Sequence, residues 1–141
     1  MTQIFFYHNA ADRISATAAL ISKAFAQKKA LLVFAPDAEL ASVLDRHLWM
    51  HPPTGFVAHV RGDSPLAAET PIVITDNLES VPQNERLFNL SAEVPPGFSR
   101  FTSVIEVVGR SDDERLAARE RVKFYKDRGY EIKFFDLAEK D

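Results

Sequence analysis

Two pairs of residues, each containing at least one histidine, have a spacing that could support chemistry. His47 and His51 are four residues apart, so on a helix both imidazoles could bind one metal ion. Two prolines follow His51 and no third ligand lies nearby in the sequence, which favours a capping or surface role. His8 and Asp12 have the same spacing and could form an acid–base pair, but a hydrogen-bonded structural histidine is the more common arrangement.

Glu106 is the other candidate, because it lies inside the apolar run SVIEVV of residues 103–108. A carboxylate at a strand end or sheet edge, paired with an arginine, is the plain interpretation, and a catalytic acid with a perturbed pKa is the alternative. The chain contains no cysteine, which excludes a thiol nucleophile, a disulfide and a thiolate metal site within it. No GxSxG or HExxH motif is present. We therefore find no convincing catalytic constellation in this sequence.

In a nucleotide-binding α/β domain, the turn after the first strand usually binds the phosphate. Here that turn reads HNAAD over residues 8–12. A phosphate-binding turn needs glycines, so that backbone amides can approach the phosphate closely. This turn has none, and none of the five glycines stands in GxGxxG or GxxxxGK[ST] spacing. We expect no phosphate-binding loop and no cofactor, although a nucleotide- or small-molecule-binding domain or enzyme of the same architecture remains the alternative.

Basic residues form the most distinctive pattern, on a helix predicted over residues 112–128. Ser111 and Glu114 make a capping box at its start, and Gly129 supplies its stop. At about 100° per residue, Ala117 and Phe124 share one side, flanked by Leu116 and Glu120. The opposite side carries what we call the basic stripe, which consists of Arg115, Arg119, Val122, Lys126 and, on its shoulder, Lys123.

The charge distribution favours a partner for this stripe, although most charged helix faces are merely solvated. Residues 115–133 contain seven basic and three acidic residues, in a chain of net charge −3. Residues 36–93 contain nine acidic residues, three arginines and no lysine. A local cationic strip on an anionic protein suits an acidic peptide or a phosphate chain. Direct binding of nucleic acid through the stripe ranks lower, because base-stacking aromatics are not interleaved with the cations except for Phe124 and Tyr125.

Trp49 ends a predicted amphipathic helix, and Phe56 follows shortly after it. A large aromatic residue in this position usually completes the core. The alternative is that Trp49, Phe56 and neighbouring loop residues form an exposed apolar patch for a protein partner.

The predicted elements place these residues in a single α/β domain spanning residues 1–141. Apolar or β-branched runs predict strands at residues 4–7, 30–34, 71–74, 87–90, 103–108 and 130–135. Helical spacing predicts helices over residues 12–28 and from Asp37 to about Met50, besides the basic one. Residues 52–70 read as irregular, with a short strand at residues 56–57 as the exception.

This rhythm predicts a three-layer α/β fold with a mostly parallel central sheet flanked by helices, Rossmann-like but without a phosphate-binding loop. No apolar run approaches the length of a membrane span, and residues 4–7 are too short for a signal-peptide core. We therefore expect a cytoplasmic protein without a membrane partner.

A set of motifs in order along the chain resembles the chi subunit of bacterial DNA polymerase III. The matching motifs are Leu48-Trp49, Phe56-x-x-His59, residues 71–74 (PIVI), residues 89–101 (NLSAEVPPGFSRF), residues 104–108 (VIEVV) and residues 118–130 (ARERVKFYKDRGY). No single motif is diagnostic, but the ordered set spans essentially the whole chain.

The resemblance implies a non-catalytic adaptor in the clamp-loader assembly that takes part in DNA replication and meets DNA only indirectly. Chi proteins join the psi subunit on one surface. On another they bind the acidic, phenylalanine-ended C-terminal tail of single-stranded-DNA-binding protein.

Carried across by position, the tail site involves Arg115, Arg119, Val122 and Lys123, with Val108 lining its apolar part, and the basic stripe adds Lys126. Trp49, Phe56 and His59 are assigned to the psi surface. Two departures from the family pattern stand in these sites. Val122 replaces a tyrosine that is frequent in the family, and Ala58 replaces the proline common just before His59.

Overall fold

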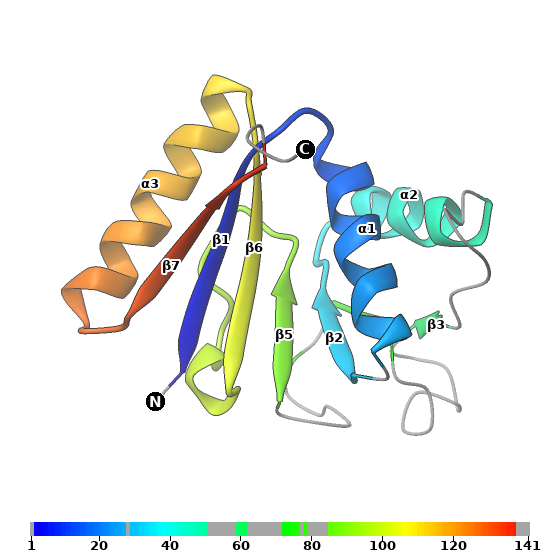
Figure 1. Cartoon of the computed structure of the whole chain (residues 1–141), viewed down its shortest axis with the longest axis horizontal. Coiled ribbons are helices and arrows are strands. Elements are labelled where there is room, and N and C mark those ends of the chain that lie inside the picture. The colour runs from blue at the N-terminus through cyan, green and yellow to red at the C-terminus, as the bar shows by residue number, and fades with distance from the viewer. Residues whose placement is uncertain are drawn as a thin grey trace.

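The central feature of the computed structural model is a seven-stranded sheet of order β3-β4-β2-β5-β6-β1-β7, in which every pairing is parallel (Figure 1). The structure describes residues 2–27, 29–50, 59–61, 72–76, 78 and 85–137, and of residues 49, 50 and 59–61 it describes the backbone only. The strands are β1 (Gln3–Ala10), β2 (Leu31–Phe34), β3 (His59–Arg61), β4 (Ile72–Thr75), β5 (Arg86–Asn89), β6 (Ser103–Gly109) and β7 (Ile132–Asp136).

Three α-helices lie between these strands in the described part of the chain, and each has a polar N-cap. Asp12 accepts hydrogen bonds from the backbone of Ile14 and Ser15 at the start of α1 (Arg13–Ala26). Asp37 does the same for α2 (Ala38–Met50), and Ser111 for α3 (Asp112–Asp127). These caps satisfy amide groups that have no partner within a helix. A short 3-10 turn, η2 (Phe98–Arg100), follows the left-handed Gly97.

The core consists of two layers on opposite faces of the sheet. On one face α1 and α2 pack over β2, β4, β5 and the part of β6 around Val107 through residues such as Ile21 and Leu44, both 0% exposed. On the other face α3 and η2 pack through Ala118, Tyr125 and Phe98. Residues alternate between the two faces along each strand, and the buried β2 (LLVF) contributes to both layers because it is covered on both sides.

Most predicted elements are confirmed to within a few residues, and the α/β class is confirmed. The stretch predicted to be irregular contains a strand, however, because residues 59–61 pair with β4 from His59 opposite Ile72 to Arg61 opposite Ile74. Backbone pairing to the exposed edge of β4, rather than a hydrophobic run, forms this strand, so the sequence pattern does not reveal it. The alternative strand at residues 56–57 lies outside the described residues. None of the helices in the described part of the chain is both long enough and apolar enough to cross a membrane.

The cap of α1 gives a direct test of this local structure. Replacing Asp12 by Ala removes the acceptor for two backbone amides and should lower the free energy of unfolding by about 1 kcal/mol. Asp12→Asn keeps an acceptor oxygen and should stay within about half of that loss. Urea denaturation measures both variants. Equal losses for the alanine and asparagine variants would contradict the capping role.

Candidate functional site

A buried ion pair joins α3 to the sheet. Glu106 of β6 is 0% exposed, and its Oε1 accepts a hydrogen bond of 2.8 Å from Arg121 Nε of α3. The hydroxyl of Tyr125 donates to the other carboxylate oxygen at 2.9 Å. Burial raises the pKa of Glu106, and the charge of Arg121 opposes that rise. Burial and the neighbouring carboxylate also raise the pKa of Tyr125, so this hydroxyl remains a donor. The predicted pairing of Glu106 with an arginine is confirmed, but the predicted position at a strand end or sheet edge is wrong, because Glu106 lies inside β6 between β5 and β1.

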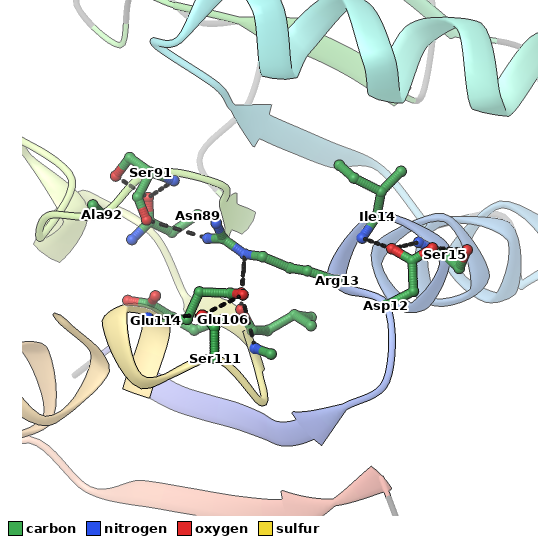
Figure 2. Close-up of polar contacts among 12 residues, drawn as sticks. Asp12, Arg13, Ile14, Ser15, Asn89, Ser91, Ala92, Glu106, Ser111 and Glu114 are labelled. Carbon is green, nitrogen blue, oxygen red and sulfur yellow. Dashed lines mark hydrogen bonds and ion pairs between the residues drawn. The ribbon is translucent and has the colours of Figure 1, made fainter. Parts of the chain in front are cut away.

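A second polar cluster lies at the carboxyl ends of β5 and β6, between the starts of α1 and α3 (Figure 2). Arg13 extends from α1 and donates to the carbonyls of Val107 at 3.1 Å and Ser91 at 3.3 Å. The carboxylate of Glu114 accepts from the amide of Gly109 at 3.0 Å, and Arg13 Nε lies 3.9 Å from it. A Cβ atom at position 109 would lie 2.6 Å from this carboxylate, so a larger residue there would have to displace the Glu114 side chain.

This edge of the sheet is where nucleotides bind in many α/β folds, but here the protein's own groups occupy it. A pocket of about 170 Å³ opens there, lined by Arg13, Arg121, Asp113, Glu114 and five other residues. Both arginines donate to protein oxygens, and both acids lie in the first turn of α3. Carboxylates at a helix N-terminus occupy the favourable position that a phosphate would need. The arrangement therefore links two helices and two strands and disfavours an anionic ligand.

The two histidine pairs take different places in the structure. Asp12 caps α1 and also accepts from the hydroxyl of Ser15 at 2.9 Å, whereas His8 faces the ring of Phe134, with centroids 6.4 Å apart. Asp12 therefore acts as a helix cap, whereas His8 packs against an aromatic ring. His47 lies half-buried in the last turn of α2, and His51 lies outside the described residues. Within the described ranges, no three side chains of His, Cys, Asp or Glu gather in a way that could hold a metal ion.

The predicted orientation of α3 needs a correction. The buried side of the helix is centred on Ala118, Arg121 and Tyr125, whereas Leu116, expected near the inner side, is 59% exposed. Glu120 is exposed as well. The helix is turned by the pairing of Arg121 with Glu106, a partner that a helical projection cannot show. The basic stripe therefore lies along one flank of the helix rather than opposite the core.

The cations of the basic stripe are nevertheless free to meet a partner. Arg115, Arg119, Lys123 and Lys126 are exposed, and Val122 is half-buried against the core. In the described part of the chain, no residue forms a hydrogen bond or ion pair with the side chains of these four cations. By contrast, Arg128 stacks on the ring of Phe124 at 3.6 Å and is already engaged.

Phe134 adds an aromatic surface beside the stripe that the sequence patterns did not reveal. It belongs to β7, which runs beside α3 (Figure 1), and its side chain is 50% exposed. Lys126 Nζ of the stripe lies 5.9 Å from the centre of this ring, and the ring of Phe6 lies 6.0 Å from it on the other side. A phenylalanine in a predicted strand is normally taken as core, so only the position of β7 at the edge of the sheet shows its exposure.

The other predicted site residues are more scattered. Val108 is 4% exposed in the core layer beneath α3 and lines the pocket at the carboxyl edge rather than the stripe. Trp49 lies in the last turn of α2 and His59 begins β3, and only their backbones are described. Phe56 lies outside the described residues. The stripe is thus the group of predicted residues that the structure brings together.

Fold and site together define a parallel α/β domain with an exposed basic helix flank, in which internal polar contacts link α1 and α3 across the carboxyl edge of the sheet. The chain belongs to the DNA polymerase III chi subunit family, because the family model described as "DNA polymerase III chi subunit, HolC" matches residues 1–133.

Curated relatives agree with this assignment. The chain is 30% identical to DNA polymerase III subunit chi of Pseudomonas aeruginosa, with 94% of each chain covered. It is 27% identical to the protein of the same name from Escherichia coli, with 86% of each covered. Among solved structures, the C-terminal domain of Dbp5 from Saccharomyces cerevisiae has a TM-score of 0.61 at 12% identity, covering 96% of this chain and 90% of that one. This last similarity concerns the fold alone.

The buried pair predicts a large and specific loss of stability. Arg121→Met leaves Glu106 without its charge partner and should lower the free energy of unfolding by about 3–5 kcal/mol. Adding Glu106→Gln removes the unpaired charge while keeping an acceptor for Tyr125, and should recover a substantial part of the loss. Arg119→Met, an exposed arginine of the same helix, should change stability by less than about 0.5 kcal/mol. Chemical denaturation measures the free energy of unfolding of Arg121→Met, of the double variant with Glu106→Gln, and of Arg119→Met.

The same variant should show a distinct pH dependence. Without Arg121 the pKa of Glu106 in the folded state rises further above its ordinary value of 4.5. The folded state then holds a proton that the unfolded state releases, so stability is greatest below the unfolded pKa and falls as pH rises towards the folded pKa. The deficit of Arg121→Met relative to the parent should therefore be smaller at acidic than at neutral pH. A deficit independent of pH would argue against an unpaired Glu106.

Proposed function

We propose that this protein is a non-catalytic adaptor of the DNA polymerase III assembly that links it to single-stranded-DNA-binding protein. The observation that carries the proposal is a row of four exposed cations without ionic partners among the described residues, next to the half-exposed ring of Phe134. Membership of the chi family supplies the context, and the acidic, phenylalanine-ended tail of single-stranded-DNA-binding protein is the ligand whose chemistry matches this surface.

In the proposed complex the terminal carboxylate and acidic side chains of the tail meet Arg115, Arg119 and Lys123. Arginine suits these groups because its planar fork can donate to both carboxylate oxygens. The phenylalanine of the tail packs against Val122, where the family often has a tyrosine. Phe134 and the alkyl chain of Lys126 provide further apolar surface beside it. Val108 acts from beneath the helix, as part of the buried layer that supports Val122.

The psi subunit is proposed to bind at the far edge of the sheet, through Trp49, Phe56 and His59. His59 lies in β3, which is at one end of the strand order, whereas β7 beside the basic stripe is at the other end. Two partners on opposite edges do not compete for the same surface. This separation supports an adaptor that holds both partners at once.

The stripe predicts an ionic and salt-sensitive interaction with the tail. Arg119→Ala should weaken binding of the tail peptide roughly three- to tenfold, since it removes an exposed charge-assisted contact. Arg46→Ala, an exposed arginine of α2, should leave the affinity unchanged. Raising the ionic strength should weaken the parent complex as well, because exposed charges are screened by salt. Fluorescence anisotropy with a labelled tail peptide measures all three effects.

Two outcomes would contradict this proposal. One is an affinity that neither salt nor Arg119→Ala alters. The other is tight binding to bare single-stranded DNA with no requirement for the tail, which would indicate direct recognition of nucleic acid.

Separate surfaces predict separable defects. Trp49→Ala should reduce copurification of the psi subunit. Its affinity for the tail peptide should stay within about twofold of the parent. Arg119→Ala should have the opposite pattern. Size-exclusion chromatography of the parent with both partners should show all three proteins in one peak. Mutual exclusion of the two partners would rule out binding at opposite edges.

A further inference from the structure

Part of one sheet face has no helix over it among the residues that the structure describes. In Figure 1, α1 and α2 lie over the β5–β2 side of the sheet, and α1 also packs on β6 near Val107, whereas no described helix lies over β1 and β7 on this face. The alternate residues of these strands, such as Phe5, Tyr7 and Phe135, point to this face because Ile4 and Phe6 point to the layer under α3. Parallel sheets are normally buried on both faces. The uncovered part is therefore an exception that a partner could complete.

Aromatic rings make up the outer part of this face. Phe135 of β7 is 41% exposed, and its ring stacks on Tyr7 with centroids 4.8 Å apart and on Phe5 at 6.3 Å. Lys133 Nζ lies 6.0 Å from the centre of the Phe5 ring. The result is a continuous apolar surface with a cation at its margin.

A trough of about 500 Å³ continues this surface up to α1. Its floor includes Phe5, Tyr7 and Ile105, and its wall is formed by Leu20 and Ala24 of α1. Its remaining described lining includes three basic residues, Lys23, Lys29 and Arg86, and no acidic residue. Arg86 has Glu85 at 3.8 Å, whereas both lysines are exposed.

The shape and charge of the trough favour a helix with acidic residues. A helix laid beside α1 would extend the same layer over β6 and β1, and its apolar side would cover the ring surface. Its carboxylates would lie near Lys23, Lys29 and Lys133. Single-stranded nucleic acid fits less well, because the wall of the trough formed by Leu20 and Ala24 is aliphatic and offers no ring for base stacking.

We propose that this trough is a second docking surface, which binds an acidic amphipathic helix of a partner protein. It is independent of the tail site, since it lies on the sheet face opposite α3. The helix completes the layer that α1 and α2 begin, and the contact buries Phe135, Tyr7 and Phe5 together.

The experiment uses the full chain and a labelled helical peptide of about eighteen residues, with leucine at i, i+3, i+4 and i+7 spacing and glutamate elsewhere. A peptide with lysine in place of each glutamate is the charge control. Binding is measured by anisotropy and located by amide chemical shifts. The acidic peptide should bind and shift residues of β1, β7 and α1. The double variant Lys23→Glu/Lys133→Glu should weaken it about tenfold.

Lys123→Glu provides the matched control, because it reverses a lysine charge on the basic stripe and should leave this binding within about twofold. Failure of the acidic peptide to bind, equal binding of the lysine peptide, or no effect of the double variant would each overturn the proposal. Displacement of the peptide by oligothymidylate would overturn it in favour of nucleic acid. A dimer in sedimentation that Phe135→Ser dissociates would overturn it in favour of a second copy of this chain.

Discussion

The contact between Glu106 and Arg121 is the constraint on which the arrangement of α3 depends. A carboxylate with no exposed surface is costly unless it is paired and hydrogen-bonded. Arg121 and Tyr125, one turn apart on the helix, bond its two oxygens and so fix the rotation of α3 on the sheet. The direction of every other side chain on the helix follows from that rotation. The exposure of Arg119 and Lys123 is thus a consequence of one buried pair.

The carboxyl edge of the sheet is held together by contacts within the protein itself. The fold is shared with a Dbp5 domain at 12% identity, and a fold of this kind does not by itself imply a function. Here Glu114 occupies the start of α3 and Arg13 spans from α1 to the backbone of β6. These contacts link α1 and α3 to the end of β6. The exposed charged and aromatic side chains lie instead on the flank of α3 and on the face of β1 and β7.

Sequence reasoning predicted most of the fold because the hydrophobic runs and the caps are local signals. The run LLVF and the capping box of Ser111 and Glu114 are examples, since each depends on residues close in the chain. The strand β3 was missed because its three residues are held by pairing with β4, which lies beyond them in the chain. Arg121 was not singled out because its partner lies 15 residues earlier, in another element. Glu106 within an apolar strand indicated that some arginine would be needed, but not which one.

The order of the strands has a consequence for how the chain reaches this structure. β1, the first strand, lies between β6 and β7, the last two, with Ile4 opposite both Val104 and Ile132. Its hydrogen bonds therefore wait until nearly all of the described chain has left the ribosome, and closing such long loops slows folding. Until then the aromatic strand β1 has no strand to pair with. Two strands that come late in the described chain, β6 and β7, thus hold in place the strand at its start.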